Sequence, residues 1–271
     1  MNQQAVHFTK MHGAGNDYIY VNSIEHSLSR PDLLAALWSD RHKGIGADGL
    51  VLIGPSESAD FSMRIFNADG SEAMMCGNAV RCIGKYLYEK GLSRKEVIRL
   101  ETLSGVKELR LAVSNGLVKE VRVDMGLPST GELRLALAVG SETYTGTVVS
   151  MGNPHYVIFV DKAEDTDIYN VGPMLERHPR FAPERTNVEF VEIRNPGEIR
   201  MRVWERGSGV TMACGTGACA SVVAGAALGL TARKVKVEMD GGEVTVEWAE
   251  SDGHVYKTGG AETVFEGTII I

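Results

Sequence analysis

The feature of the sequence that most constrains its fold is an internal repeat. The pair Gly15-Asn16 recurs as Gly152-Asn153, 137 positions later, and each pair precedes an apolar run. Cys76 and Cys214 each stand twelve positions after an arginine, and each is followed directly by glycine. The matches keep one order and nearly one spacing, which is typical of a duplicated domain. The chain should therefore hold two similar halves, with the two cysteines in equivalent places.

Each half is predicted to be rich in strands. Segments such as 108–113 and 234–239 alternate apolar and polar residues, and turn residues lie between such segments. The expected class is α+β, with two pseudo-symmetric strand-rich domains that each wrap a central helix. Two lobes of this kind can place an active site in the cleft between them.

The central helices are expected over residues 77–90 and 215–228, each ending at a glycine. The second is apolar on almost every side, so it must be buried all round. The first departs from this, because it carries an i, i+4 polar stripe of Arg81, Lys85 and Glu89. A shorter helix is expected over 32–39, with a proline at its first turn.

Composition excludes several classes of protein. The formal net charge of −7 argues against a nucleic-acid surface, which needs clustered Lys and Arg. No run of 18 apolar residues could cross a membrane, and the first residues lack the pattern of a secretory signal. A cytoplasmic protein is expected. Four cysteines in 271 residues do not indicate a disulfide scaffold, so they are expected to be thiols.

Cys76 and Cys214 stand immediately before the predicted helices. A helix N-terminus favours thiolate over thiol by about 0.3–2 kcal/mol, which poises a cysteine thiol near neutral pH. Its unpaired N–H groups can also hold a carboxylate. Cys82 and Cys219 lie inside the helices, where a cysteine is simply a small apolar residue. A disulfide between Cys76 and Cys214 is the alternative, and it would inactivate such a pair rather than stabilise the fold.

Two equivalent acid–base groups on two lobes suit one kind of reaction. One thiolate can remove a proton from one face of a carbon while the opposite thiol delivers a proton to the other face. The α-proton of an amino acid is weakly acidic, so its removal needs electrostatic support, which helix N–H groups could supply to the carboxylate. The pattern favours inversion of an amino-acid stereocentre.

With these residues in view, the chain closely resembles the diaminopimelate epimerase family over essentially its full length. The segments that carry the resemblance are Lys10–Asp17, Arg64–Glu72, Cys76-Gly77-Asn78, Gly152-Asn153-Pro154-His155, Thr186–Phe190, Trp204–Gly209 and Ala213–Gly217. Together these segments are highly specific. The resemblance implies a first domain over 1–127, joined by a last strand over 264–271, and a second domain over 128–263.

The resemblance also implies a reaction and a site. The expected reaction interconverts LL- and meso-2,6-diaminopimelate without a cofactor, for lysine and peptidoglycan precursor biosynthesis. Cys76 and Cys214 correspond to the acid–base pair. The implied substrate contacts are Asn16, Asn67, Asn153, Asn187, Glu205 and Arg206; the backbone donors to the reacting carboxylate are Gly77, Asn78, Gly215 and Thr216; and His155 and Glu205 tune the cysteines. Gly49 departs from the family pattern, since some relatives have glutamine there, so no side-chain contact is assigned to it.

Other interpretations stay open for single residues and for the whole chain. Without the resemblance, Asn153-Pro154 is an ordinary turn and His155 a structural histidine. A proline- or hydroxyproline-type racemase also uses two cysteines. Its substrates have no distal amino-acid group, so they would not need the polar side chains of Asn67, Asn153, Asn187 and Arg206. A non-catalytic thiol redox protein is a further alternative, which the absence of a Cys-x-x-Cys motif weakens.

The expected partners follow from the same pattern. No histidine and cysteine spacing fits zinc, and no lysine motif indicates pyridoxal phosphate, so neither a metal nor a cofactor is expected. The expected partner is a small-molecule substrate, with no nucleic acid and no membrane. A homodimer is the oligomeric state left open.

Overall fold

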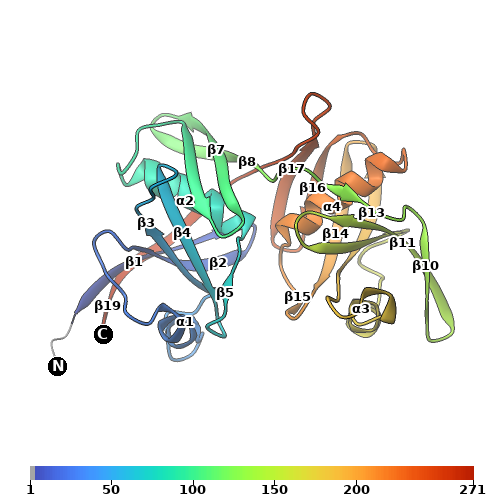
Figure 1. Cartoon of the computed structure of the whole chain (residues 1–271), viewed down its shortest axis with the longest axis horizontal. Helices are drawn as coiled ribbons and strands as arrows, with labels where there is room; N and C mark the ends of the chain where they lie inside the picture. The colour runs from blue at the N-terminus through green and yellow to red at the C-terminus, as the bar shows by residue number, and fades with distance from the viewer. Residues whose placement is uncertain (1–3) are drawn as a thin grey trace. The chain divides into compact units, whose positions relative to one another are not determined.

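The computed structural model describes residues 4–271, which form two compact units. Unit 1 comprises the chain up to Val123 together with Gly259–Ile271, and unit 2 comprises Asp124–Thr258. Figure 1 shows each unit as strands around a helix, with unit 1 mostly in blue to green and unit 2 in green to orange. The predicted strand-rich α+β class is confirmed. Within residues 4–271, no helix has the length and apolar character needed to cross a membrane.

Unit 1 is a mixed sheet with two helices. Its elements are β1 (Ala5–Gly13), β2 (Asn16–Asn22), α1 (Pro31–Ser39), β3 (Gly49–Gly54), β4 (Phe61–Asn67), β5 (Glu72–Ala73), α2 (Gly77–Glu89), β6 (Val97–Thr102), β7 (Gly105–Ser114), β8 (Leu117–Asp124) and β19 (Glu262–Ile270). The strand order is β19-β1-β2-β3-β4-β6-β7-β8, and β5 also pairs with β4. Helix α2 contacts β1, β2 and β7, which lie towards opposite ends of this order, so the sheet bends around the helix.

Unit 2 repeats this plan. Its elements are β9 (Ser129–Thr130), β10 (Leu135–Val139), β11 (Glu142–Ser150), β12 (Pro154–Val160), α3 (Ile168–Glu176), η1 (Pro179–Phe181), β13 (Asn187–Asn195), β14 (Glu198–Glu205), β15 (Gly209–Val210), α4 (Gly215–Ala227), β16 (Lys234–Met239), β17 (Gly242–Trp248) and β18 (Val255–Gly259). The strand order is β10-β11-β12-β13-β14-β16-β17-β18. Helix α4 contacts β11, β12, β13, β14, β16 and β17.

The two units match element by element, which confirms the predicted duplication. The parallel pairs β2–β3 and β4–β6 of unit 1 correspond to the parallel pairs β12–β13 and β14–β16 of unit 2. The central helices α2 and α4 both have 13 residues. Each begins directly after a cysteine, as predicted. One element comes from a different part of the sequence in the two units. In unit 2 the strand that pairs with β11 is β10, which directly precedes it. In unit 1 the strand that pairs with β1 is β19, which follows unit 2 in the sequence.

The strands in the middle of each unit are buried on both faces. All six residues of β3 are buried. Leu50 and Leu52 pack with Ala35 and Trp38 of α1 on one face. Their alternating neighbours point to the other face, where α2 lies. This explains why β3 reads as a continuous apolar run rather than an alternating one.

Helix α3 was not predicted from the sequence. It contains Gly172 and Pro173, both poor helix formers, which hides it from a reading by propensity. A Cβ at position 172 would lie 2.7 Å from the Trp204 side chain, so glycine lets α3 pack closely on β14. The repeat itself carries the missing signal, since α1 occupies the same place in unit 1.

The polar stripe on α2 proves to be part of the packing. Arg81 has no exposed surface. Its Nε donates to the Gly260 carbonyl at 3.1 Å, and its Nη1 donates to the Asn78 amide oxygen at 3.0 Å. Lys85 and Glu89 form an ion pair at 2.8 Å, and both also bond the backbone of Val118 in β8. Helix α4 is almost wholly buried, as predicted.

The units divide four residues before the predicted boundary at 127/128. The Met125 N–H donates to the Val255 carbonyl, and the Val255 N–H donates to the Gly126 carbonyl, both at 2.9 Å, so this segment is bound to unit 2. At the other end, unit 1 resumes at Gly259 rather than at 264. Strand β19 pairs along β1 from Ala5↔Ile270 to His12↔Glu262.

Candidate active site

Cys76 is the residue that caps the N-terminus of α2 in unit 1. Its backbone is extended, with φ −129° and ψ 116°, and its side chain is half-buried. The Sγ–H donates to the Asn16 amide oxygen, with Sγ and Oδ1 3.2 Å apart. The Asn78 side-chain amide reaches the same oxygen at 3.5 Å. Three residues predicted for the site therefore meet at this helix N-terminus.

A carboxylate that the sequence did not single out holds Asn16. The Asn16 Nδ2 donates to Asp48 Oδ2 at 2.7 Å, and the backbone N–H of Asp17 donates to the same oxygen at 3.1 Å. Arg41 forms ion pairs with Asp17 and Asp48 at 2.7 and 2.9 Å, and Lys10 pairs with Asp17 at 2.7 Å. Burial and the nearby Asp17 raise the pKa of the Asp48 carboxyl above its usual value.

Position 49 lies beside these groups and carries no side chain. A Cβ there would lie 2.1 Å from the Phe66 carbonyl oxygen and 2.9 Å from the Tyr18 ring. The close approach of β4 therefore leaves no room for a side chain at position 49. Burial, followed by the nearby Cys76, raises the pKa of the Tyr18 phenol well above its usual value.

Cys214 caps the N-terminus of α4 in unit 2, the place equivalent to that of Cys76. It is only 5% exposed. Its Sγ accepts from the Gly217 N–H at 3.4 Å and lies 3.6 Å from the Thr216 hydroxyl. A Cβ at position 217 would lie 3.2 Å from that sulfur and 2.7 Å from Glu189 Oε1. Glycine is thus needed where the helix begins over these groups.

A row of polar side chains leads away from Thr216 into the unit. Asn153 Nδ2 donates to Thr216 Oγ1 at 3.2 Å, and Asn153 Oδ1 lies 3.1 Å from His155 Nε2. His155 Nδ1 lies 2.7 Å from Glu189 Oε1, and neither of these two side chains is exposed. The sequence predicted Asn153, His155 and Thr216 for the site, but not Glu189, which sits inside an apolar strand.

Carboxylates and burial set the charge state of Cys214. Burial, then the carboxylates of Glu205 and Glu189, raise the pKa of the Cys214 thiol well above its usual value. The expectation that a helix N-terminus poises this thiol near neutral pH is therefore wrong for Cys214 in this structure. Burial also raises the pKa of Glu205, which accepts a hydrogen bond from the Thr211 hydroxyl.

The remaining predicted contacts fall at the ends of strands. Asn187 is 4% exposed; its Nδ2 donates to the Pro154 carbonyl at 2.8 Å, and its Oδ1 accepts from the Arg206 N–H at 2.9 Å. The Arg206 guanidinium is exposed and donates to the Glu184 carbonyl. Asn67 ends β4 in unit 1 and donates to the Ser71 hydroxyl at 3.0 Å. Asn187 and Arg206 are thus brought together, while Asn67 belongs to the other unit.

Cys82 and Cys219 behave as the sequence predicted for ordinary apolar residues. Both are fully buried inside the central helices. Burial raises the pKa of the Cys82 thiol to about 11, so this thiol stays protonated at neutral pH. All four cysteines are free thiols.

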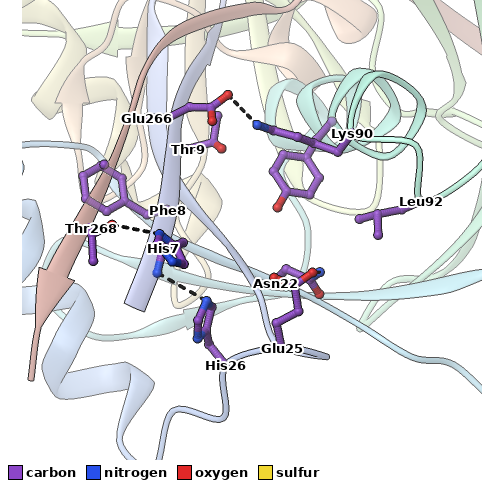
Figure 2. A pocket seen from close by; sticks show the side chains of 12 residues that line it. His7, Phe8, Thr9, Asn22, Glu25, His26, Lys90, Leu92, Glu266 and Thr268 are labelled. Carbon is purple, nitrogen blue, oxygen red and sulfur yellow. Dashed lines mark hydrogen bonds and ion pairs between the residues drawn. The ribbon is translucent and has the colours of Figure 1, made fainter. Parts of the chain in front are cut away.

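Unit 1 also has an open hollow of about 440 Å³ near the other end of α2 (Figure 2). His7, His26 and Glu25 line it together with Lys90, which lies just after the last residue of α2. None of the predicted site residues lines this hollow. Within unit 1, it is therefore separate from the groups around Cys76.

The family model described as diaminopimelate epimerase matches residues 8–130 and 147–264. The chain is 62% identical to the diaminopimelate epimerase of Parabacteroides distasonis over 266 residues, which cover 98% of both chains. The chain belongs to the diaminopimelate epimerase family. It is 61% identical to the family member from Phocaeicola vulgatus, covering 97% of this chain and 98% of that relative. The predicted family and the predicted enzyme class, isomerase, are confirmed.

Solved structures show how widely this fold is shared outside the diaminopimelate epimerase family. A PhzF-family phenazine biosynthesis protein from Bacillus anthracis superimposes with a TM-score of 0.77 at 17% identity, covering 99% of this chain and all of that one. A hydroxyproline epimerase from Agrobacterium vitis superimposes with a TM-score of 0.74 at 15% identity, covering 98% and 93%. At these identities the likeness concerns the fold alone.

Proposed function

We propose that this chain interconverts LL- and meso-2,6-diaminopimelate by moving an α-proton between Cys76 and Cys214. The observation that carries the proposal is the equivalence of the two cysteines. Each caps a buried central helix in one of two matching units. A duplicated acid–base position is what inversion of a stereocentre requires, because one group must act on each face of the carbon.

The steps balance without any added reactant. A thiolate takes the α-proton as the carbon–hydrogen bond breaks, and its electron pair stays on the α-carbon and spreads into the carboxylate. The thiol on the opposite face then gives its proton to that carbon and becomes the thiolate. The helix N-termini at Gly77-Asn78 and Gly215-Thr216 are proposed to hold the reacting carboxylate and stabilise the added charge. The raised pKa of Cys214 supports a starting state in which Cys214 carries the proton.

The distal end of the substrate is proposed to select diaminopimelate over smaller amino acids. Diaminopimelate carries a second amino-acid group, whereas proline and hydroxyproline do not. Asn67, Asn187 and Arg206 offer amide and guanidinium groups for it. The shared fold of the hydroxyproline epimerase does not carry its substrate over to this chain, because the identity is only 15%.

The same proposal includes the setting of the enzyme. We propose that it works in the cytoplasm, where a reducing environment keeps its four free cysteines as thiols. Its product would serve lysine and peptidoglycan precursor synthesis. The proposed partner is the small-molecule substrate, and a homodimer is the oligomeric state to test in solution.

Proton NMR in D2O tests the reaction directly. Reduced enzyme, treated with a chelator and dialysed, is incubated with meso-diaminopimelate. We expect deuterium to appear at an α-carbon and the LL isomer to form, because the cysteine pair needs neither a metal nor pyridoxal phosphate. A sample without enzyme, measured in the same way, is the control. No exchange from a well-folded sample would refute the reaction, and activity that returns only with a metal or pyridoxal phosphate would refute the cofactor-free mechanism.

Oxidation should inactivate the enzyme reversibly. If the two thiols approach one carbon from opposite faces, diamide can oxidise them to a disulfide, with loss of two protons and two electrons to the oxidant. Peptide mass spectrometry should then find a Cys76–Cys214 linkage, and dithiothreitol should remove it as activity returns. Cys82 and Cys219 should stay unmodified because both are buried. Inactivation without that linkage would count against the proposed facing of the two cysteines.

A further inference from the structure

Asn16 and Asn153 occupy equivalent places in the two units but present opposite ends of their amides. Asn16 begins β2 and Asn153 precedes β12. In unit 1 the carbonyl oxygen of Asn16 faces Cys76 Sγ at 3.2 Å. In unit 2 the amide nitrogen of Asn153 faces Thr216, whose hydroxyl lies 3.6 Å from Cys214 Sγ. The duplication thus supplies an acceptor beside one cysteine and a donor on the side of the other.

A different neighbour sets each orientation. Asp48 Oδ2 lies 2.7 Å from the Asn16 nitrogen, and an ionised carboxylate can only accept hydrogen bonds. The amide end of Asn16 must therefore point to Asp48, which leaves its carbonyl for Cys76. In unit 2 the neighbour is His155, whose Nε2 lies 3.1 Å from the Asn153 carbonyl, while the amide nitrogen of Asn153 lies 3.2 Å from Thr216 Oγ1.

Asp48 is itself held in place, so the orientation does not depend on one bond. The Asp17 N–H donates to the same oxygen, Oδ2, at 3.1 Å, and Arg41 binds the other oxygen, Oδ1, at 2.9 Å. Lys10 and Arg41 both pair with the Asp17 carboxylate. The two cations balance the two carboxylates, and they leave Oδ2 of Asp48 to the Asn16 amide and the Asp17 backbone.

We propose that Asp48 is a positioning residue for Cys76, which fixes the Asn16 carbonyl as the acceptor of the Cys76 thiol hydrogen. The proposal deepens the acid–base role proposed above for Cys76 and rests on it. When Cys76 removes the α-proton, the new S–H bond finds an acceptor already in place. Without Asp48, Asn16 can turn its N–H₂ group to the sulfur, which stabilises the thiolate and weakens it as a base.

The test compares two substitutions at position 48. Asp48→Ala removes the acceptor that orients Asn16. Asp48→Asn keeps one carbonyl oxygen. Two donors, the Asn16 amide and the Asp17 N–H, face the place of Oδ2 and one, Arg41, faces that of Oδ1, so we expect the carbonyl to lie at the place of Oδ2. We expect Asp48→Ala to lower kcat by about tenfold with little change in KM, while Asp48→Asn, whose carbonyl can accept the same two hydrogen bonds, stays close to the wild type. Asp60→Ala is the matched control, since Asp60 also accepts a backbone N–H in unit 1, from Arg99.

A measurement without substrate separates this inference from the proposed reaction. Iodoacetamide alkylates the two cysteines at pH 7, and peptide mass spectrometry follows each one separately. In Asp48→Ala, alkylation of Cys76 should become about tenfold faster, because N–H donors then favour its thiolate. Alkylation of Cys214, in unit 2, should not change, which also shows that the chain remains folded.

The outcomes are distinct. The inference is overturned if Cys76 reacts in Asp48→Ala as it does in the wild type, or if Asp48→Asn is as impaired as Asp48→Ala. A faster reaction of Cys76 confined to Asp48→Ala supports the orienting role even if the wild type fails to act on diaminopimelate. In that case the proposed substrate would be refuted, while the proposed role of Asp48 would stand.

Discussion

Cys76→Ser and Cys214→Ser should each lower the rate of epimerisation by about 10²- to 10⁴-fold. A serine hydroxyl can donate a proton, but it is a far weaker base than a thiol at neutral pH. Both groups act in either direction of the reaction, so neither loss can be bypassed. The fold should survive, because serine is close to cysteine in size and the helix N–H groups remain. Steady-state turnover of purified, reduced variants measures the effect.

The two variants should differ in which stereoisomer still exchanges its α-proton. Each keeps a cysteine on one face of the carbon only, so deuterium uptake from the LL and meso isomers should show opposite preferences. Cys82→Ala is the matched control: it removes a thiol from the same helix as Cys76, but one that is fully buried. That variant should turn over like the wild type. Near-normal turnover of either serine variant would remove that cysteine from the mechanism.

Arg81→Met should lower the free energy of unfolding of unit 1 by about 3 kcal/mol. Methionine fills similar space, but it leaves the Gly260 carbonyl and the Asn78 amide oxygen without the hydrogen bonds that Arg81 donates at 3.1 and 3.0 Å. Buried acceptors that lose a charged donor are costly. Because Gly260 lies where the chain returns to unit 1, just before β19, the substitution should loosen β19 as well as the N-terminus of α2.

Hydrogen exchange followed by mass spectrometry locates this effect. Peptides from 259–271 and from α2 should exchange faster in Arg81→Met, while peptides from β12, β13 and β14 in unit 2 should not change. Arg94→Met is the control, since Arg94 is exposed in the same unit and its loss should change stability by less than about 0.5 kcal/mol. Unchanged exchange at 259–271 in Arg81→Met would show that the buried guanidinium does not secure the last strand.

Much of the fold could be predicted because the two halves of the sequence carry the same pattern of residues. The repeat gives two matching units, and the glycines after residues 90 and 228 mark the ends of the central helices. Helix α3 was not predicted because Gly172 and Pro173 both have low helical propensity. Packing against Trp204 outweighs that low propensity in the folded chain. No local pattern marks the division after Val123, since hydrogen bonds join Met125 and Gly126 to Val255, which lies far from them in the sequence.

Some features of the site likewise depend on residues close together in the sequence, and others on residues that only folding brings together. The place of Cys76 before a helix is a local property, so the spacing of nearby residues reveals it. Asp48, just before β3, and Glu189, in β13, are brought to the site by folding, and nothing close to them in the sequence marks them as polar partners of Asn16 and His155. The raised pKa of Cys214 likewise depends on burial, and then on carboxylates, that only folding brings about. Such partners become visible only with the tertiary structure.

The pairing of β19 with β1 has a consequence for how the protein is made. Strand β1 precedes unit 2 in the sequence and its neighbour β19 follows it, whereas every strand of unit 2 lies in one continuous stretch between them. Unit 2 can thus complete its hydrogen bonding while the sheet of the earlier-synthesised half still lacks its edge. The backbones of Gln4 and Ile271 bond each other in both directions at 2.9 Å. The sheet of unit 1 can therefore close only after the segments on both sides of unit 2 in the sequence have been synthesised.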